Sequence, residues 1–282
     1  MSILYVQGRY VWRHQGQVSV FERGYQFADG VYEVLWVDKG RLRDKHAHYE
    51  RLQHSMHALA LHLPYPIKVL DLLCQQVIAK NRFQQGALYI QVGRGHRFSR
   101  THVQEQDNGR LSVVIIPVYS PNPKSLPIKV VTRPDTRWRH CHIKSIALVK
   151  SVLSKHDAQR QGADEAWFVD EETGVVTEGA SSNAWLIDKK GVVRTHPPDH
   201  RILHGVARHV TLSLCRQLGI PCEEKAFSKA DIADARGAFA TSTTLFIAPI
   251  SHIDGVAIDT TQQGDVIQRL FQRYQEHITS DA

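Results

Sequence analysis

The spacing of hydrophobic and polar residues changes several times along the chain, and each change marks a predicted element. Helical spacing predicts one helix over 44–61, capped by Asp44 and ended by Pro64, and a second helix over 67–81. Short runs of β-branched and aromatic residues, bounded by turn formers, predict strands over 4–6, 10–12, 31–37, 87–92 and 111–118. This part of the chain therefore mixes strands and helices without strict alternation.

A segment with three prolines, two serines and no periodicity, 119–127, separates these elements from the rest. Beyond it we expect helices over 145–161 and 205–218, a closing amphipathic helix, and strands over 128–132, 165–169, 175–176, 183–187 and around Phe239 and Val256. We therefore predict an α+β fold with two domains. The N-terminal α+β domain would span 1–118, the interdomain linker 119–127 and the C-terminal α+β domain 128–282.

Composition excludes several classes of protein. An apolar fraction of 42% is too high for a disordered chain. We find neither a run of about 20 apolar residues nor a secretory signal, so we expect no membrane partner. The four cysteines match no zinc or redox spacing, which favours free thiols, a cytoplasmic location and no metal. The net charge of +7 is spread along the chain, so we expect no nucleic-acid partner.

Two charged residues stand out as candidates for chemistry. Lys144 precedes a predicted helix among arginines and histidines, whose positive charge disfavours the ammonium form. A neutral amine is the form that Schiff-base chemistry requires. Glu178 lies beside glycine and small hydroxyl residues between two apolar runs, which suggests a packed turn that faces a ligand. An ordinary turn is the alternative, because glycine, serine and asparagine favour turns.

Two further segments could bind an anion. Gly205 precedes the predicted helix 205–218, and the free N–H groups at a helix start suit a phosphate or carboxylate. Four consecutive hydroxyl residues, 241–244, could hold a phosphate, although an exposed strand is the alternative. The histidines on the helix 44–61 are interpreted as a solvated face with some rings at the edge of the core, rather than as metal ligands, because the His-Glu-x-x-His pattern is absent.

Two longer motifs, 22–33 (ERGYQFADGVYE) and 177–183 (TEGASSN), are highly specific in combination. Together with 48–52, 141–145, 202–205 and 241–244, they make the chain resemble the fold-type IV, pyridoxal-phosphate-dependent (class IV) aminotransferases over nearly its whole length. The D-amino-acid (D-alanine) aminotransferases are the most similar subgroup. The resemblance implies pyridoxal 5'-phosphate as cofactor, an active site at the domain interface and a homodimer.

The resemblance also implies roles for individual residues. Lys144 would form the internal aldimine with the cofactor, and Glu178 would keep the pyridine nitrogen protonated so that the ring can accept electrons. Leu203 would pack against the ring, and Ser181 would lie near it. The phosphate would be bound by Arg51, Thr243 and the backbone of Val206 and Ala207. Ala207 departs from the family, which often has a threonine there.

The substrate side separates the subgroups of this fold. Tyr32, Arg100 and His102 match the residues that bind the substrate α-carboxylate in D-amino-acid aminotransferases, although the preceding loop is one residue longer and Arg97 competes with Arg100. The resemblance thus implies ping-pong transamination between a D-amino acid such as D-alanine and a 2-oxo acid such as 2-oxoglutarate. The alternatives are a branched-chain or (R)-amine aminotransferase, an aminodeoxychorismate lyase, or a non-enzymatic anion- or nucleic-acid-binding protein.

Overall fold

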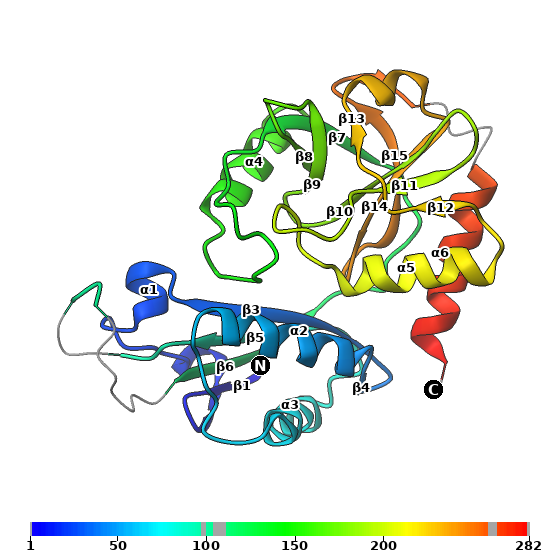
Figure 1. Ribbon diagram of the computed structural model, residues 1–282. Coiled ribbons are helices and arrows are strands. Elements are labelled where there is room, and N and C mark those ends of the chain that lie inside the picture. The colour runs from blue at the N-terminus through cyan, green and yellow to red at the C-terminus, as the bar shows by residue number, and fades with distance from the viewer. Residues whose placement is uncertain (1, 97–99, 104–110, 259–263, 281–282) are drawn as a thin grey trace. The chain divides into compact units, whose positions relative to one another are not determined.

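The computed structural model describes residues 2–96, 100–103, 111–258 and 264–280 (Figure 1). The chain divides into two compact units. Unit 1 comprises Met1–Asn122 and Ile143–Ala147, and unit 2 comprises Pro123–His142 and Leu148–Ala282. Each unit combines a β-sheet with α-helices, so the predicted α+β class is confirmed.

Unit 1 contains an antiparallel sheet with the strand order β2-β1-β6-β5-β3-β4. Helices α2 and α3 pack against this sheet. In chain order the elements are β1 (Ile3–Val6), β2 (Arg9–Trp12), the 3₁₀ helix η1 (Arg13–Gln15), α1 (Arg23–Phe27), β3 (Gly30–Asp38), β4 (Arg41–Leu42), α2 (Lys45–Ala58), α3 (Ile67–Asn81), β5 (Gln85–Gly93) and β6 (Ser112–Tyr119).

The core of unit 1 forms where the two helices meet the sheet. Leu52 of α2 and Leu70 of α3 are fully buried against strand residues such as Leu88. Burial of each such side chain contributes roughly 1.5–3 kcal/mol, so the apolar stripe that predicted α3 also explains its position. Asp44 occupies the predicted N-cap position of α2, although its backbone is left-handed (φ 50°) and its side chain accepts no capping hydrogen bond.

The segment 143–147 differs from the prediction, which placed it in the C-terminal domain with a helix starting at Ser145. The segment is extended along β3, where Tyr32 N–H donates to the Lys144 carbonyl (3.0 Å) and Ile146 N–H to the Gly30 carbonyl (3.1 Å). These bonds require an extended backbone, so α4 begins only at Val149. The segment therefore belongs to unit 1 although the chain on both sides of it belongs to unit 2.

Unit 2 is built on a larger mixed sheet with the strand order β12-β11-β10-β14-β15-β7-β8-β9-β13, and β16 pairs with β15. Strands β15, β7 and β8 run parallel to one another, as do β11 and β12. The elements are β7 (Ile128–Pro134), α4 (Val149–Arg160), β8 (Glu165–Val169), β9 (Val175–Gly179), β10 (Asn183–Ile187), β11 (Val193–Thr195), α5 (Val206–Gln217), β12 (Cys222–Glu223), β13 (Phe227–Ser228), the 3₁₀ helix η2 (Ala230–Asp234), β14 (Gly237–Ser242), β15 (Phe246–Ile253), β16 (Val256–Ala257) and α6 (Gly264–Thr279).

Large aromatic side chains fill the interior of unit 2. Trp185 of β10 stacks on Phe239 of β14 with ring centroids 5.2 Å apart, and its indole N–H donates to Thr241 Oγ1 (2.9 Å). Helix α5 packs on β14 and on α6, while α4 packs on β7 and β8. Two features of unit 2 carry predicted site residues: the end of β9, with Glu178, and the first turn of α5, with Val206 and Ala207.

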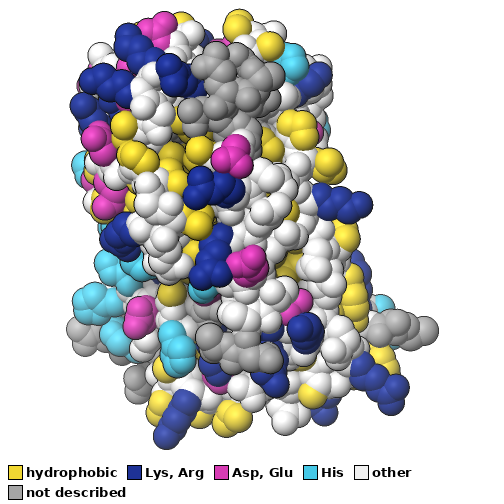
Figure 2. Space-filling model, turned by 90° about the vertical axis from the view of Figure 1, so that its right-hand side faces the viewer, with side chains coloured by type: hydrophobic (Ala, Val, Ile, Leu, Met, Phe, Trp, Pro, Cys, Tyr) yellow, Lys and Arg dark blue, Asp and Glu magenta, His cyan; other side chains and the backbone are white. Residues whose placement is uncertain are grey.

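Figure 2 shows one face of the molecule, with side chains coloured by type. Lys and Arg side chains on the face drawn in Figure 2 are interspersed with acidic and uncharged residues. Within the described residues, no helix combines the length and apolar character that crossing a membrane requires. The cytoplasmic location remains a prediction.

Candidate active site

Lys144 is positioned by its contact with β3. Its backbone N–H donates to Ser55 Oγ on α2 (3.1 Å), and its carbonyl accepts from Tyr32, as described above. Its Nζ atom lies 4.4 Å from the ring centroid of Tyr32, which in turn stacks on Tyr89 at 5.6 Å. Two residues that the sequence analysis assigned separately, one to the cofactor and one to the substrate, are therefore neighbours.

Arg51 on α2 is oriented by a buried carboxylate. Its Nε and Nη2 atoms donate to the two oxygens of Glu33 (2.7 and 2.8 Å), and His48 Nδ1 lies 2.7 Å from the same carboxylate. Burial alone would raise the pKa of Glu33, but the charge and hydrogen bonds of Arg51 and His48 hold it well below its usual value. His48 is buried, whereas His46, His54 and His57 of the same helix are exposed, so the predicted combination of a solvated face and rings at the core edge is confirmed.

Glu178 has hydrogen-bond donors on both carboxylate oxygens. Arg137 Nη1 donates to Oε1 (2.5 Å), while Asn183 Nδ2 (3.1 Å) and the Leu203 backbone N–H (2.9 Å) donate to Oε2. Burial raises the pKa of Glu178, and Arg137 and Leu203 oppose that rise. Glu178 lies in β9 rather than in the predicted turn, because β9 continues to Gly179, which pairs with Trp167 of β8.

Arg137 binds two carboxylates, and its side chain is 11% exposed. It forms a two-pronged ion pair with Asp135 (2.9 and 2.8 Å) besides its bond to Glu178, and its guanidinium lies 4.4 Å from the ring centroid of Phe168. Burial would raise the pKa of Asp135, but Arg137 lowers it. The planar guanidinium fork suits such a position, since it can donate to both groups at once.

The start of α5 has the features of an anion site. The first N–H groups of a helix lack intrahelical partners, and the described first turn of α5 contains no acidic residue. Gly205 precedes this turn, and a Cβ atom there would overlap Asn183 Oδ1, so the close approach requires glycine. Val206 and Ala207 are buried in that turn. This arrangement fits the phosphate of the predicted cofactor.

The remaining cofactor residues of unit 2 differ in how they are placed. Leu203 is half-buried beside the Glu178 carboxylate that its backbone binds. Thr243 is half-buried in the turn between β14 and β15, between Ser242 and Thr244, whose hydroxyls lie 3.5 Å apart. Ser181 is exposed, and its hydroxyl donates to Glu165 Oε2 (2.7 Å).

Arg100 and His102 gather around one aromatic ring of unit 1. The Arg100 guanidinium lies 4.6 Å from the ring centroid of Phe27, and the His102 ring lies 5.0 Å from it. Both residues are exposed, and Arg100 forms no ion pair with a carboxylate in the described part of the chain. Arg97, the competing arginine, lies outside the described residues.

The predicted residues thus fall into two groups. Unit 1 holds Lys144, Tyr32, Arg51, Arg100 and His102, and unit 2 holds the other six: Glu178, Ser181, Leu203, Val206, Ala207 and Thr243. Three residues that the sequence analysis missed, Glu33, Arg137 and Asn183, orient members of these groups. The signal for Glu33 was a carboxylate inside an apolar strand pattern, since a buried charge requires a partner.

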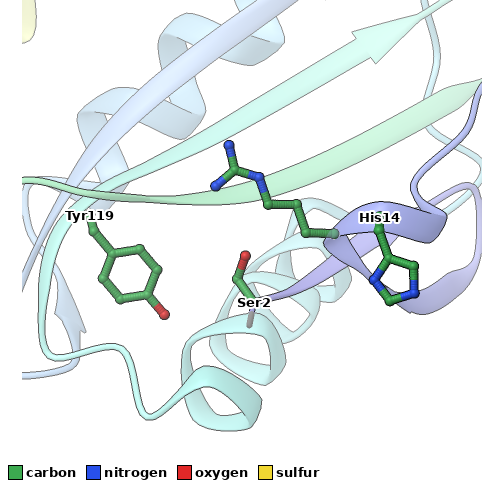
Figure 3. A pocket seen from close by; sticks show the side chains of 4 residues that line it. Ser2, His14 and Tyr119 are labelled. Carbon is green, nitrogen blue, oxygen red and sulfur yellow. The ribbon is translucent and has the colours of Figure 1, made fainter.

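Two surface hollows of unit 1 contain none of the predicted site residues. One, of about 610 Å³, is lined by Ser2, Arg13, His14 and Tyr119 (Figure 3). The other, of about 790 Å³, lies beside the β3–β4 turn and includes Lys39, Arg41 and Arg82. Among the described residues, no group of three or more His, Cys, Asp or Glu side chains could hold a metal ion.

Comparison with known proteins assigns the chain to a family. The family model described as amino-transferase class IV matches residues 30–253, so the chain belongs to the class IV aminotransferases. It is 36% identical to a D-alanine aminotransferase of Listeria monocytogenes serotype 4b (strain F2365) over 284 aligned residues, which cover 99% of this chain and 96% of the relative.

Solved structures agree with this assignment. The branched-chain aminotransferase of Thermoproteus uzoniensis, solved with norvaline, has a TM-score of 0.84 at 25% identity and covers 98% of this chain and 94% of its own. A hypothetical aminotransferase from Mycobacterium tuberculosis, solved in its PLP-bound form, has the same TM-score at 22% identity with full coverage of both chains. The fold-type IV architecture is therefore confirmed, and pyridoxal phosphate is the cofactor of this family.

Proposed function

We propose that this class IV aminotransferase transfers the amino group of a D-amino acid, such as D-alanine, to a 2-oxo acid, such as 2-oxoglutarate, in two half-reactions. The observation that carries the proposal is the pairing of Arg100 and His102 on Phe27, which presents a cation without a carboxylate partner in the described chain. The 36% identity to D-alanine aminotransferase supports the same substrate class.

The bound cofactor supplies a protonated pyridine ring that stores the electrons left at the substrate Cα when its proton is removed. Lys144 holds the cofactor and, once its amine is released and neutral, takes that proton as general base. The adjacent Tyr32 ring and the backbone bonds to β3 and Ser55 limit where the amine can lie. The same amine can then give the proton back, so one residue serves as both base and acid.

Glu178 is proposed to accept a hydrogen bond from the ring nitrogen. Arg137, Asn183 and Leu203 donate to its carboxylate and so favour the ionised form, against the burial that raises its pKa. These three donors leave the carboxylate little freedom to rotate, so it is oriented before the cofactor binds. The residues of unit 2 are proposed to bind and orient the cofactor, not to form covalent bonds with it.

The phosphate is proposed to lie at the start of α5. Val206 and Ala207 would donate their backbone N–H groups, and Thr243 its hydroxyl. Arg51 would add charge from unit 1, with its guanidinium held by Glu33. Ala207 offers no hydroxyl, which removes one side-chain hydrogen bond worth about 1 kcal/mol net.

Substrate chirality and oxo-acid acceptance form the direct test. Purified enzyme is incubated with 2-oxoglutarate and a panel of D- and L-amino acids, and the product amino acid is resolved on a chiral column. We expect D-glutamate from D-alanine, and no product from the Lys144→Ala variant. L-Leucine as the preferred donor would contradict the proposal and favour a branched-chain aminotransferase.

Three other assignments stay proposals. A homodimer is expected from the family resemblance, and analytical ultracentrifugation at micromolar concentration tests it. Ser181 near the cofactor and an active site served by residues of both units also rest on that resemblance. Family membership argues against the non-enzymatic alternative.

A further inference from the structure

Helix α1 and the connection from β5 to β6 lie at the same end of the unit 1 sheet (Figure 1). The connection leaves β5 after Gly93, and its described residues include Arg94–His96 and Arg100–Val103. Both described parts of this connection are bound by α1 and its flanking residues. These contacts determine the positions of the Arg100 and His102 side chains.

The first part of the connection is fixed by two carboxylates. Asp29 accepts from Arg94 Nε (2.8 Å) and from Arg23 Nε (2.9 Å), so it joins α1 to the end of β5. Glu22 is buried and accepts from the Gly95 backbone N–H (3.3 Å), and it forms a β-bridge with His96.

The second part is held against Phe27. The guanidinium groups of Arg23 and Arg100 lie 4.8 and 4.6 Å from the ring centroid of Phe27, within the range of cation–π attraction. The ring of His102 lies 5.0 Å from the same ring, and Arg23 Nη1 donates to the carbonyl of Thr101 (2.6 Å). One aromatic ring therefore contacts Arg100 and His102, two of the three residues of the predicted carboxylate site, while Arg23 fixes the peptide between them.

The charges in this cluster favour an anionic ligand at Arg100. The charge of Arg23 is balanced by Asp29 at 2.9 Å. Arg100 has the Phe27 ring as its described partner, and an aromatic face attracts a cation without neutralising it. A substrate carboxylate can therefore still form a full ion pair with Arg100.

We propose that Phe27 is a positioning residue that orients Arg100 and His102 toward the substrate α-carboxylate. The inference rests on the proposed D-amino-acid transamination and adds to it a residue that touches neither substrate nor cofactor. Loss of the ring should weaken carboxylate binding, because the two side chains would then have to be ordered by the substrate itself.

The test compares Phe27→Leu, which keeps an apolar side chain, with Phe27→Tyr, which restores the ring. For Phe27→Leu we expect the KM for D-alanine to rise about tenfold, with kcat within about twofold of the unchanged enzyme. Propionate, which resembles D-alanine without its amine, should lose inhibitory strength by the same factor. Phe27→Tyr should recover both values.

Tyr25→Leu is the matched control, since Tyr25 is an aromatic residue of the same helix that is 75% exposed. It should leave the KM unchanged. An unchanged KM in Phe27→Leu would overturn the inference. A raised KM that is explained by a lower melting temperature and weaker cofactor binding would overturn it as well. If the unchanged enzyme does not turn over D-alanine at all, the proposed function fails first and the inference with it.

Discussion

Replacing Glu33 with glutamine removes a fully buried negative charge and leaves the volume of the side chain nearly unchanged. Glu33 is 0% exposed, and its carboxylate binds two nitrogens of Arg51 and one of His48 at 2.7–2.8 Å. Removal of one partner of a buried ion pair costs about 3–5 kcal/mol, because the other charge is left buried and unpaired. Glutamine still offers one oxygen, so we expect the lower end, about 3 kcal/mol.

The assay is urea unfolding of the cofactor-free protein, followed by circular dichroism, with Glu50→Gln as control. Glu50 lies on the same helix as Arg51 and is exposed, so its change should stay within about 0.5 kcal/mol. If Glu33→Gln lowered the unfolding free energy by less than about 0.5 kcal/mol, the buried pair of Glu33 and Arg51 would contribute no more than a surface residue, contrary to our expectation.

The same pair predicts a pH dependence with a definite sign. The pKa of Glu33 is lowered from its ordinary value of 4.5, so its contribution to stability is complete above that pH. As the pH falls below 4.5, the unfolded chain takes up the proton first and the contribution is lost. The difference in unfolding free energy between the unchanged protein and Glu33→Gln should therefore shrink between neutral pH and pH values well below 4.5.

Three further outcomes are expected. Arg137→Met leaves the buried Glu178 and the partly buried Asp135 without their shared cation and should lower the unfolding free energy by about 3 kcal/mol in urea. Gly205→Ala should weaken cofactor binding at least about tenfold in a spectroscopic titration, because the new Cβ displaces Asn183. Cys222 should react fastest of the four cysteines with iodoacetamide, since a hydrogen bond from Cys215 lowers its pKa whereas burial raises those of Cys74 and Cys141 to about 12.

Each of these has a contrary result. Arg137→Met as stable as the unchanged protein would mean that the carboxylates find other partners. Full cofactor affinity in Gly205→Ala would remove the argument for close approach at the start of α5. For the thiols, mass spectrometry that finds Cys141 modified before Cys222 would contradict the assignment of the lowered pKa.

Periodic elements were predictable because their pattern follows from local burial. The predicted bounds of α3 (67–81), β8 (165–169) and β10 (183–187) match the structure, since each carries an uninterrupted apolar pattern. Helix α1 was missed because its five residues are too few to establish a period. Its position depends instead on tertiary bonds: the Gly95 N–H donates to Glu22, and Arg23 donates to the Thr101 carbonyl.

The candidate site was predictable as a set of residues but not as a geometry. Lys144 and Glu178 stand in specific motifs, whereas the groups that orient them come from distant parts of the chain. Arg137 is 41 positions from Glu178, and Ser55 is 89 from Lys144. Turn-forming residues around Glu178 suggested a loop, but pairing with β8 extends β9 to Gly179, so Glu178 lies in the strand and the bend is confined to 180–182.

The half-reaction with a single donor tests directly whether the enzyme prefers D-amino acids. Enzyme loaded with pyridoxal phosphate is mixed with D-alanine or L-leucine in the absence of any 2-oxo acid, and the cofactor absorbance and the 2-oxo acid released are followed together. We expect D-alanine to bleach the absorbance band above about 400 nm and to release one equivalent of pyruvate. Bleaching by L-leucine should be slower by at least about a hundredfold. Faster bleaching by L-leucine would contradict this expectation.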